Sequence, residues 1–548
     1  MEELSPQSSR DCAPAPKLKD GLQVEREKTP GPGPIPGPAH SVRKRFAFTV
    51  VANLFRSLLS FVTGMLLARW LGPSDYGNMA FLLGTFVGLR LLLDMGTSTA
   101  FFTFLSQQPR SRRFVLIYYA WLAIQFVVPL LVLGLLLPSQ WIETIWRGQQ
   151  RGLVLLAFAA TFMQNSVWAV VQQAGESQRK TLLVQAIGVA VVALHLLVVG
   201  LLWLTGTLGL YAVFAVLAVE YLAASLIAQK WLPFDETRHD SEDELKPLLR
   251  KYAVYCLPMV PYAAMGFAQE FADRWLLQTF GGGIQQAFYA VGAQFAAIAL
   301  LATTSILRIF WKEVAEAHHQ KDHARAHRLY QRVSRLLFLI GAIVAGFLIP
   351  WSPDLLGRLL GAAYVGGATT LAIMFLYPIH QSMGQIGNTV LFATERVKLQ
   401  VITGILTMLV GLVVSYFMIA PPTARIPGLG LQSQGLALKM VGVQLLSVNV
   451  IAYLVARVWD RPFDWIYQPV SLIGCVTLGW VAHAASVLAL GSSPNLVLLM
   501  AAAALVYIPL IGSFVYAVPW TAGLTRAELV NDLRAVTLAR LTSKQPAS

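Results

Sequence analysis

The chain has 548 residues, of which 56% are hydrophobic and only 13% are charged. This composition is too apolar for a soluble globular domain and predicts a polytopic membrane protein. The formal net charge of +14 would suit nucleic acid, but the bases gather in loops on one side of the predicted membrane, so we exclude a nucleic-acid partner.

The first 42 residues are polar and contain the run PGPGPIPGPA, which cannot form a helix. They lack the basic start, apolar core and cleavage site of a signal peptide. We therefore expect residues 1–42 to be a disordered, Pro-rich cytoplasmic tail. The three cysteines, Cys12, Cys256 and Cys475, are far apart, so neither a zinc cluster nor a disulfide framework is indicated.

Long apolar runs predict transmembrane helices, because about 20 apolar residues cross a bilayer as a helix. The runs are continuous and do not alternate at every second residue, which favours helices over a barrel. The predicted fold class is an all-α polytopic membrane protein with about 14 transmembrane helices, and 12 helices stay an alternative. The predicted segments are 46–68, 77–105, 114–137, 152–172, 181–204, 208–231, 252–280, 286–311, 333–350, 364–391, 399–419, 434–456, 467–490 and 495–519.

The distribution of Lys and Arg predicts the orientation. Connections on one side hold 27 of the 42 Lys and Arg residues, and those on the other side hold five. Because cytoplasmic loops carry the excess of bases, both termini are expected in the cytoplasm.

A weak internal repeat predicts two halves. The tripeptide RWL occurs at 69–71 and again at 274–276, and AGESQRKTLLVQ is echoed by ATERVKLQVITG. Six helices in each half preserve the orientation, as in known transporters. The predicted divisions are a six-helix bundle at 43–231, a cytoplasmic linker at 232–251, a second six-helix bundle at 252–460, two additional helices at 461–520 and a cytoplasmic tail at 521–548.

Several ionised side chains fall inside the apolar segments, where each central Arg costs about 2.5 to 3.5 kcal/mol on insertion scales. Arg56 has no acid within a helical turn, so it needs a distant partner or a polar cavity. Arg90 and Asp94 share a helix face at a spacing of four residues, as do Glu270 and Arg274. Each pair can neutralise itself, and a purely structural ion pair stays open beside a functional role.

Three further charged residues are candidates for substrate binding or ion coupling. Lys439 lies early in the twelfth predicted helix and is read either as a cavity residue or as a structural one. Glu220 and Asp273 are candidate proton or cation sites if transport is coupled to ions. A carboxylate that is only protonated or hydrogen-bonded is the alternative for both.

Other motifs receive structural interpretations. His195 and His380 are isolated in apolar segments and are read as core residues. The turn at 281–283 is GGG without the Lys and Ser/Thr of a phosphate loop, so no nucleotide site follows. Pro258 and Pro261 are expected to kink the seventh helix. No catalytic residue, metal site or cofactor is predicted.

The run LLARWLGPSDYGNMAFLLGTFVGLRLLLDMGTSTA resembles the N-terminal signature of the polysaccharide biosynthesis transporters, flippases of lipid-linked oligosaccharides in the multidrug/oligosaccharidyl-lipid/polysaccharide exporter (MOP) superfamily. The run EFADRWLLQTFGGGIQQAFYAVGAQFA and the AGESQRK and ATERVK turns extend the resemblance from Phe46 to about Trp459. It implies two six-helix bundles around a central cationic cavity, with helices thirteen and fourteen as an additional pair. Arg56, Arg90 and Arg274 fit the cationic positions of such a cavity.

The resemblance implies a non-enzymatic flippase that moves undecaprenyl-diphosphate-linked oligosaccharide across the bacterial cytoplasmic (inner) membrane for surface polysaccharides. Implied partners are the lipid-linked glycan, the membrane, a polysaccharide polymerase and chain-length machinery. A cation-coupled multidrug antiporter, an integral-membrane glycosyltransferase or polymerase, and a membrane scaffold stay as alternatives. The expected substrate-binding residues are Arg56, Arg90, Arg274 and Lys439, and those for ion coupling are Asp94, Glu220, Glu270 and Asp273.

Overall fold

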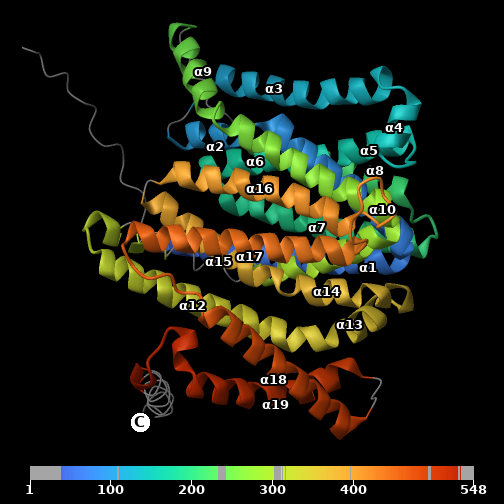
Figure 1. The fold of residues 1–548 in the computed structure, drawn as a ribbon. Coiled ribbons are helices and arrows are strands. Elements are labelled where there is room, and N and C mark those ends of the chain that lie inside the picture. The colour runs from blue at the N-terminus through green and yellow to red at the C-terminus, as the bar shows by residue number, and fades with distance from the viewer. Residues whose placement is uncertain are drawn as a thin grey trace, which may run out of the picture. The chain divides into compact units, whose positions relative to one another are not determined.

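The structure is a computed structural model that describes residues 39–107, 110–232, 242–300, 310, 313–314, 316–394, 396–491, 495–528 and 531. All regular elements within these residues are helices, which confirms the predicted all-α class (Figure 1). Most of the predicted N-terminal tail, Cys12 and the end of the C-terminal tail lie outside the described residues.

The helices follow one another with short connections. In the first half they are α1 (Ala39–Asp94), α2 (Thr97–Gln107), α3 (Arg112–Leu131), η1 (Val132–Leu136), α4 (Ser139–Ile145), α5 (Arg151–Phe162), η2 (Met163–Val167), α6 (Trp168–Ser177), α7 (Thr181–Leu204) and α8 (Leu210–Lys230). In the second half they are α9 (Glu242–Cys256), α10 (Met259–Leu300), α12 (His323–Leu348), η3 (Ile349–Trp351), α13 (Ser352–Leu359), η4 (Ala362–Gly367), α14 (Ala368–Met374), α15 (Tyr377–Ala393), α16 (Val397–Ile419), α17 (Gln432–Val458), α18 (Tyr467–Leu490), α19 (Leu496–Ala517) and η5 (Pro519–Ala522).

Eleven helices in the described part are long and apolar enough to span a membrane. The first of these candidate spans, Phe48–Asp94, is counted once although it covers most of the two predicted segments 46–68 and 77–105. Helix α10 is not among the eleven, and its first half carries Glu270, Asp273 and Arg274. The chain is a multi-pass membrane protein, and the count of 14 helices stays a prediction.

Two glycines break the two longest helices in the same way. Gly72 in α1 has φ 76° and ψ 169°, and Gly282 in α10 has φ 69° and ψ −171°. This backbone conformation lies in a region that only glycine adopts readily. The repeated break supports the internal repeat, but Arg69 lies three residues before its glycine and Arg274 eight before its own. The two RWL motifs are therefore not at equivalent positions.

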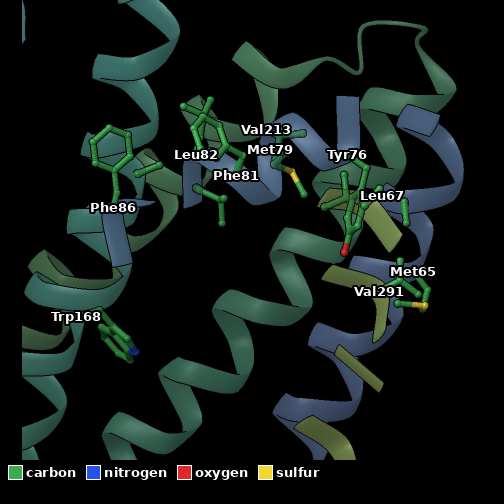
Figure 2. Packing of buried hydrophobic residues seen from close by; sticks show 14 of the residues in the cluster. Met65, Leu67, Tyr76, Met79, Phe81, Leu82, Phe86, Trp168, Val213 and Val291 are labelled. Atoms are coloured by element: carbon green, nitrogen blue, oxygen red, sulfur yellow. The ribbon is translucent and has the colours of Figure 1, made fainter. Parts of the chain in front are cut away.

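A large apolar core joins several helices. Figure 2 shows part of it, with Phe81 and Phe86 of α1, Trp168 of α6, Val213 of α8 and Val291 of α10 in one cluster. Elsewhere, α16 packs against α17, and α18 packs against both α12 and α19.

The described residues from Phe48 onward form one compact unit, and the predicted bundle boundaries stay predictions. Part of the predicted linker is helical, since α9 starts at Glu242, while residues 233–241 lie outside the described residues. The predicted kink at Pro258 is a full break, because α9 ends at Cys256 and α10 begins at Met259.

Candidate functional site

Arg56 points toward neighbouring helices of the protein. Its guanidinium donates to Asn53 Oδ1 at 3.1 Å. A Cβ placed on Gly188 of α7 would lie 3.5 Å from Arg56 Nη1, 3.5 Å from the Trp168 ring and 3.7 Å from Gln172 Nε2. The charge therefore lies against α6 and α7, in accord with the rule that an intramembrane cation faces protein or water.

A π-helical turn, η2, interrupts the span that contains Trp168 and Gln172. It includes Gln164 and Asn165, and Asn165 Nδ2 donates to the Thr161 carbonyl at 3.3 Å. Single π-turns inside α-helices occur frequently at functional sites. Our sequence interpretation did not identify these polar residues, although amide side chains in an apolar segment were the available signal.

Asp94 ends α1 and does not pair with Arg90. Its carboxylate accepts from the Ser98 amide at 2.9 Å, the Ser98 hydroxyl at 2.9 Å and the Thr97 hydroxyl at 3.2 Å. Asp94 therefore caps α2, because these donors lie at the start of that helix. Arg90 is half-buried and has no ion pair or hydrogen bond within the described residues. The possible ion pair of Arg90 with Asp94 is not formed within the described residues, where the Asp94 carboxylate instead accepts hydrogen bonds from α2.

Glu270 and Arg274 of α10 lie against glycines of α1. A Cβ on Gly84 would be 2.8 Å from Arg274 Nε, and one on Gly88 would be 3.2 Å from the Glu270 Cβ. The Arg274 guanidinium also lies over the Tyr289 ring, 5.1 Å from its centroid. In the described part of the chain these two residues do not form the expected i, i+4 ion pair, and both are half-buried. The missing side chains of Gly84 and Gly88 give the charged residues their space.

Lys439 has its charge neutralised inside the protein. Its ammonium lies 2.5 Å from Asp273 Oδ2, and the two side chains are 1% and 9% exposed. The Ser415 hydroxyl donates to Asp273 Oδ1. The three residues join α17, α10 and α16. Since the pair is already satisfied, Lys439 has no free charge to offer an anionic ligand.

Glu220 is paired as well. His195 Nδ1 lies 2.8 Å from Glu220 Oε2, which links α7 to α8. The second oxygen, Oε1, is buried without a hydrogen-bond partner among the described residues. His195 is thus a partnered interior residue, as predicted, and Glu220 keeps one oxygen free for a proton or a ligand.

The segments that follow the two glycine breaks contact each other. A Cβ on Gly77 would lie 1.7 Å from the Gly283 carbonyl oxygen, so only glycine fits there. Gln278 donates to Asn78 at 2.9 Å and Tyr76 donates to Gln294 at 3.1 Å across the same contact. This junction packs α1 against α10 next to the backbone break inside each helix.

The family model described as polysaccharide biosynthesis protein matches residues 42–311. This part of the chain is therefore similar to that family. The match includes α1 and α10, which carry Arg56, Arg90 and Arg274, and so confirms the resemblance seen in the sequence. A search of curated protein sequences found no match.

Solved structures show which fold the chain has. The lipid II flippase MurJ in an inward-closed conformation matches with a TM-score of 0.61 at 12% identity, covering 86% of this chain and 99% of that one. An inward-facing multidrug resistance MATE transporter of the MOP superfamily matches with a TM-score of 0.55 at 14% identity, covering 74% of this chain and 96% of that one. A MOP-superfamily transporter from Pyrococcus furiosus, described as having a binding pocket of reversed polarity, gives 0.50 at 14% identity, covering 76% and 95%. The chain therefore has the fold of the MOP-superfamily transporters.

Proposed function

We propose that this protein is a flippase that moves undecaprenyl-diphosphate-linked oligosaccharide from the inner to the outer leaflet by alternating access. The observation that carries the proposal is a contrast among the intramembrane cations. Lys439 is neutralised by Asp273, whereas Arg56, Arg90 and Arg274 have no carboxylate partner among the described residues. Unpaired guanidinium groups in membrane-spanning helices call for an anionic ligand.

A diphosphate suits these groups chemically. The planar guanidinium pairs with phosphate through two parallel hydrogen bonds, and it stays charged at every physiological pH. Burying a diphosphate in hydrocarbon is prohibitive, but a hydrated chamber lined by Arg removes most of that cost. The prenyl tail can stay in lipid while the head group moves.

The energy for uphill movement can come from the membrane. A potential that is negative inside favours outward movement of an anion by about 2.3 kcal/mol per charge per 100 mV. Ion coupling through Glu270 or Glu220 is the second part of the proposal. Glu270 is half-buried without an ion-pair partner in the described part of the chain. Glu220 has one carboxylate oxygen without a hydrogen-bond partner among the described residues. Asp273 and Asp94 are weaker candidates, since each already holds its own partners.

The proposed setting is the bacterial cytoplasmic membrane, with both termini in the cytoplasm and with two six-helix bundles at 43–231 and 252–460. A polysaccharide polymerase and chain-length machinery would use the product. The proposal includes no catalytic role for this chain.

A cation-coupled antiporter is the second candidate, and the half-buried carboxylate of Glu270 is the observation that favours it. Reconstitution separates the two functions. Vesicles containing the protein should move a labelled undecaprenyl-diphosphate sugar and leave a cationic dye where it is. Dye efflux driven by a proton or sodium gradient, without lipid movement, would overturn the flippase proposal.

A further inference from the structure

A seam runs between α3 and the helices α9 and α10, and it contains two cavities. The first has a volume of about 380 Å³ and is lined by Ile117 and Tyr118 of α3 and by Cys256 and Val260 on the facing side. The second also has a volume of about 380 Å³ and lies farther along, between Val128 and Pro129 of α3 and Phe267 and Phe271 of α10. Both cavities are lined almost entirely by apolar atoms, so they suit hydrocarbon and not water.

The two walls run in the same direction, since residue numbers rise together along α3 and α9–α10. At 1.5 Å per residue, the lining from residue 114 to residue 133 of α3 and η1 extends for about 29 Å, close to the thickness of the hydrocarbon core. The seam is therefore long enough to accommodate the chains of a lipid.

Basic residues stand at the shared beginning of both walls. Arg113 is exposed at the start of α3, and one turn later Ile117 is 40% exposed. Lys251 is exposed in α9, and Val254 and Leu257 beyond it are 64% and 69% exposed. On both helices the change from exposed base to exposed apolar residue marks the level where head groups meet acyl chains.

The wall of the first cavity is held in place by hydrogen bonds. Tyr252 of α9 donates to the Thr97 carbonyl at 2.5 Å, and Trp121 of α3 donates to the Thr97 hydroxyl at 3.4 Å. These bonds tie both sides of the seam to the start of α2, while the space between Ile117 and Cys256 stays open. The cavity is thus bounded by fixed groups and is not a gap between loosely packed helices.

We propose that this seam binds an anionic phospholipid of the surrounding bilayer, with its phosphate at Arg113 and Lys251 and its acyl chains in the two cavities. Charge complementarity selects the head group, because basic pockets between transmembrane helices recognise anionic lipids. The seam joins segments of both predicted bundles, so a bound lipid would stabilise their contact. This proposal does not depend on the transported substrate.

Lipid titration of the full-length protein in neutral detergent tests the site. Phosphatidylglycerol and phosphatidylcholine are added separately, and binding is followed by native mass spectrometry and by the unfolding temperature. We expect the wild type to bind phosphatidylglycerol more tightly. The double variant Arg113→Ala with Lys251→Ala should lose about 30-fold in phosphatidylglycerol affinity, since each base near the surface contributes roughly fivefold.

The matched control is Arg328→Ala with Lys398→Ala, which removes one exposed Arg and one exposed Lys near the starts of α12 and α16. It should bind phosphatidylglycerol as the wild type does. A third variant, Ile117→Trp, fills the first cavity and should weaken both lipids while leaving the bases in place. Equal phosphatidylglycerol affinity in the wild type and in the Arg113/Lys251 double variant would overturn the proposal, as would equal losses in the double variant and its control.

Discussion

The ammonium of Lys439 lies 2.5 Å from Oδ2 of Asp273, although 166 residues separate the two in the chain. Because both side chains are almost fully buried, each depends on the other for charge compensation. Lys439→Met leaves the Asp273 carboxylate without a counter-charge and should destabilise the protein by about 3 to 5 kcal/mol. Thermal unfolding in detergent measures the loss.

The double variant Lys439→Met with Asp273→Leu separates a structural pair from a transport site. Replacing both charges by apolar groups should recover most of the stability, because neither charge is then left unpaired. The control is Arg325→Ala, which breaks the more exposed Arg325–Glu313 pair and should cost less than about 1 kcal/mol. A Lys439→Met variant as stable as the wild type would show that the pair is not formed.

Gly84 provides the space that Arg274 occupies. A Cβ there would be 2.8 Å from Arg274 Nε, so Gly84→Ala must displace the guanidinium. We expect a loss of binding to a diphosphate lipid with little loss of stability, since only a flexible side chain has to move. The control is Gly200→Ala in α7, where no atom lies within 4 Å of the new Cβ. If both variants bind equally well, Arg274 does not contact the ligand from this position.

Gly77 and Gly283 allow the junction between α1 and α10 to close. The Gly283 carbonyl would lie only 1.7 Å from a Cβ on Gly77, so Gly77→Ala has to separate the backbones. The variant should fold, but α1 and α10 should separate at this contact. A cysteine introduced by Asn78→Cys should then react faster with a water-soluble thiol reagent. Gly442→Ala is the control, since its Cβ meets nothing within 4 Å. Unchanged labelling would contradict a closing role for this glycine contact.

Asp94 is predicted to cap a helix and not to carry ions. Asp94→Ala removes the acceptor for the Ser98 amide and should cost about 1 kcal/mol. Asp94→Asn keeps a good capping side chain while removing the charge, so it should retain both stability and transport. A stable Asp94→Asn variant that has lost transport would instead assign the carboxylate to ion coupling.

Local features of the fold could be predicted from the sequence. Apolar length identified the spanning helices, and the turns at Gly72 and Gly282 were visible in LGPSDYG and GGG. Capping of α2 by Asp94 was also predictable, because Met95 and Gly96 end α1 just before Thr97 and Ser98. Both hydroxyls donate hydrogen bonds to the Asp94 carboxylate. Helical spacing alone favoured the wrong partner, Arg90.

Long-range partners were not predictable. Nothing in the sequence connects Lys439 with Asp273 or His195 with Glu220, because such pairs depend on how distant helices pack. The same holds for the glycine at position 84, whose role exists only because Arg274 crosses it. The bases at the start of the α3–α9 seam were counted as topology signals, and only the packed helices bring them together above a cavity.

The central claim is that unpaired intramembrane guanidinium groups bind the diphosphate of the transported lipid. The direct test is the rate at which reconstituted protein flips a labelled undecaprenyl-diphosphate sugar. Arg56→Ala and Arg90→Ala should each lower the rate by about 10- to 100-fold, since a hydrogen bond to a charged group contributes roughly 1.5 to 3 kcal/mol. Arg425→Ala, at an exposed connection, should have no effect. Equal flipping by the wild type and both variants, at equal protein levels, would contradict the claim.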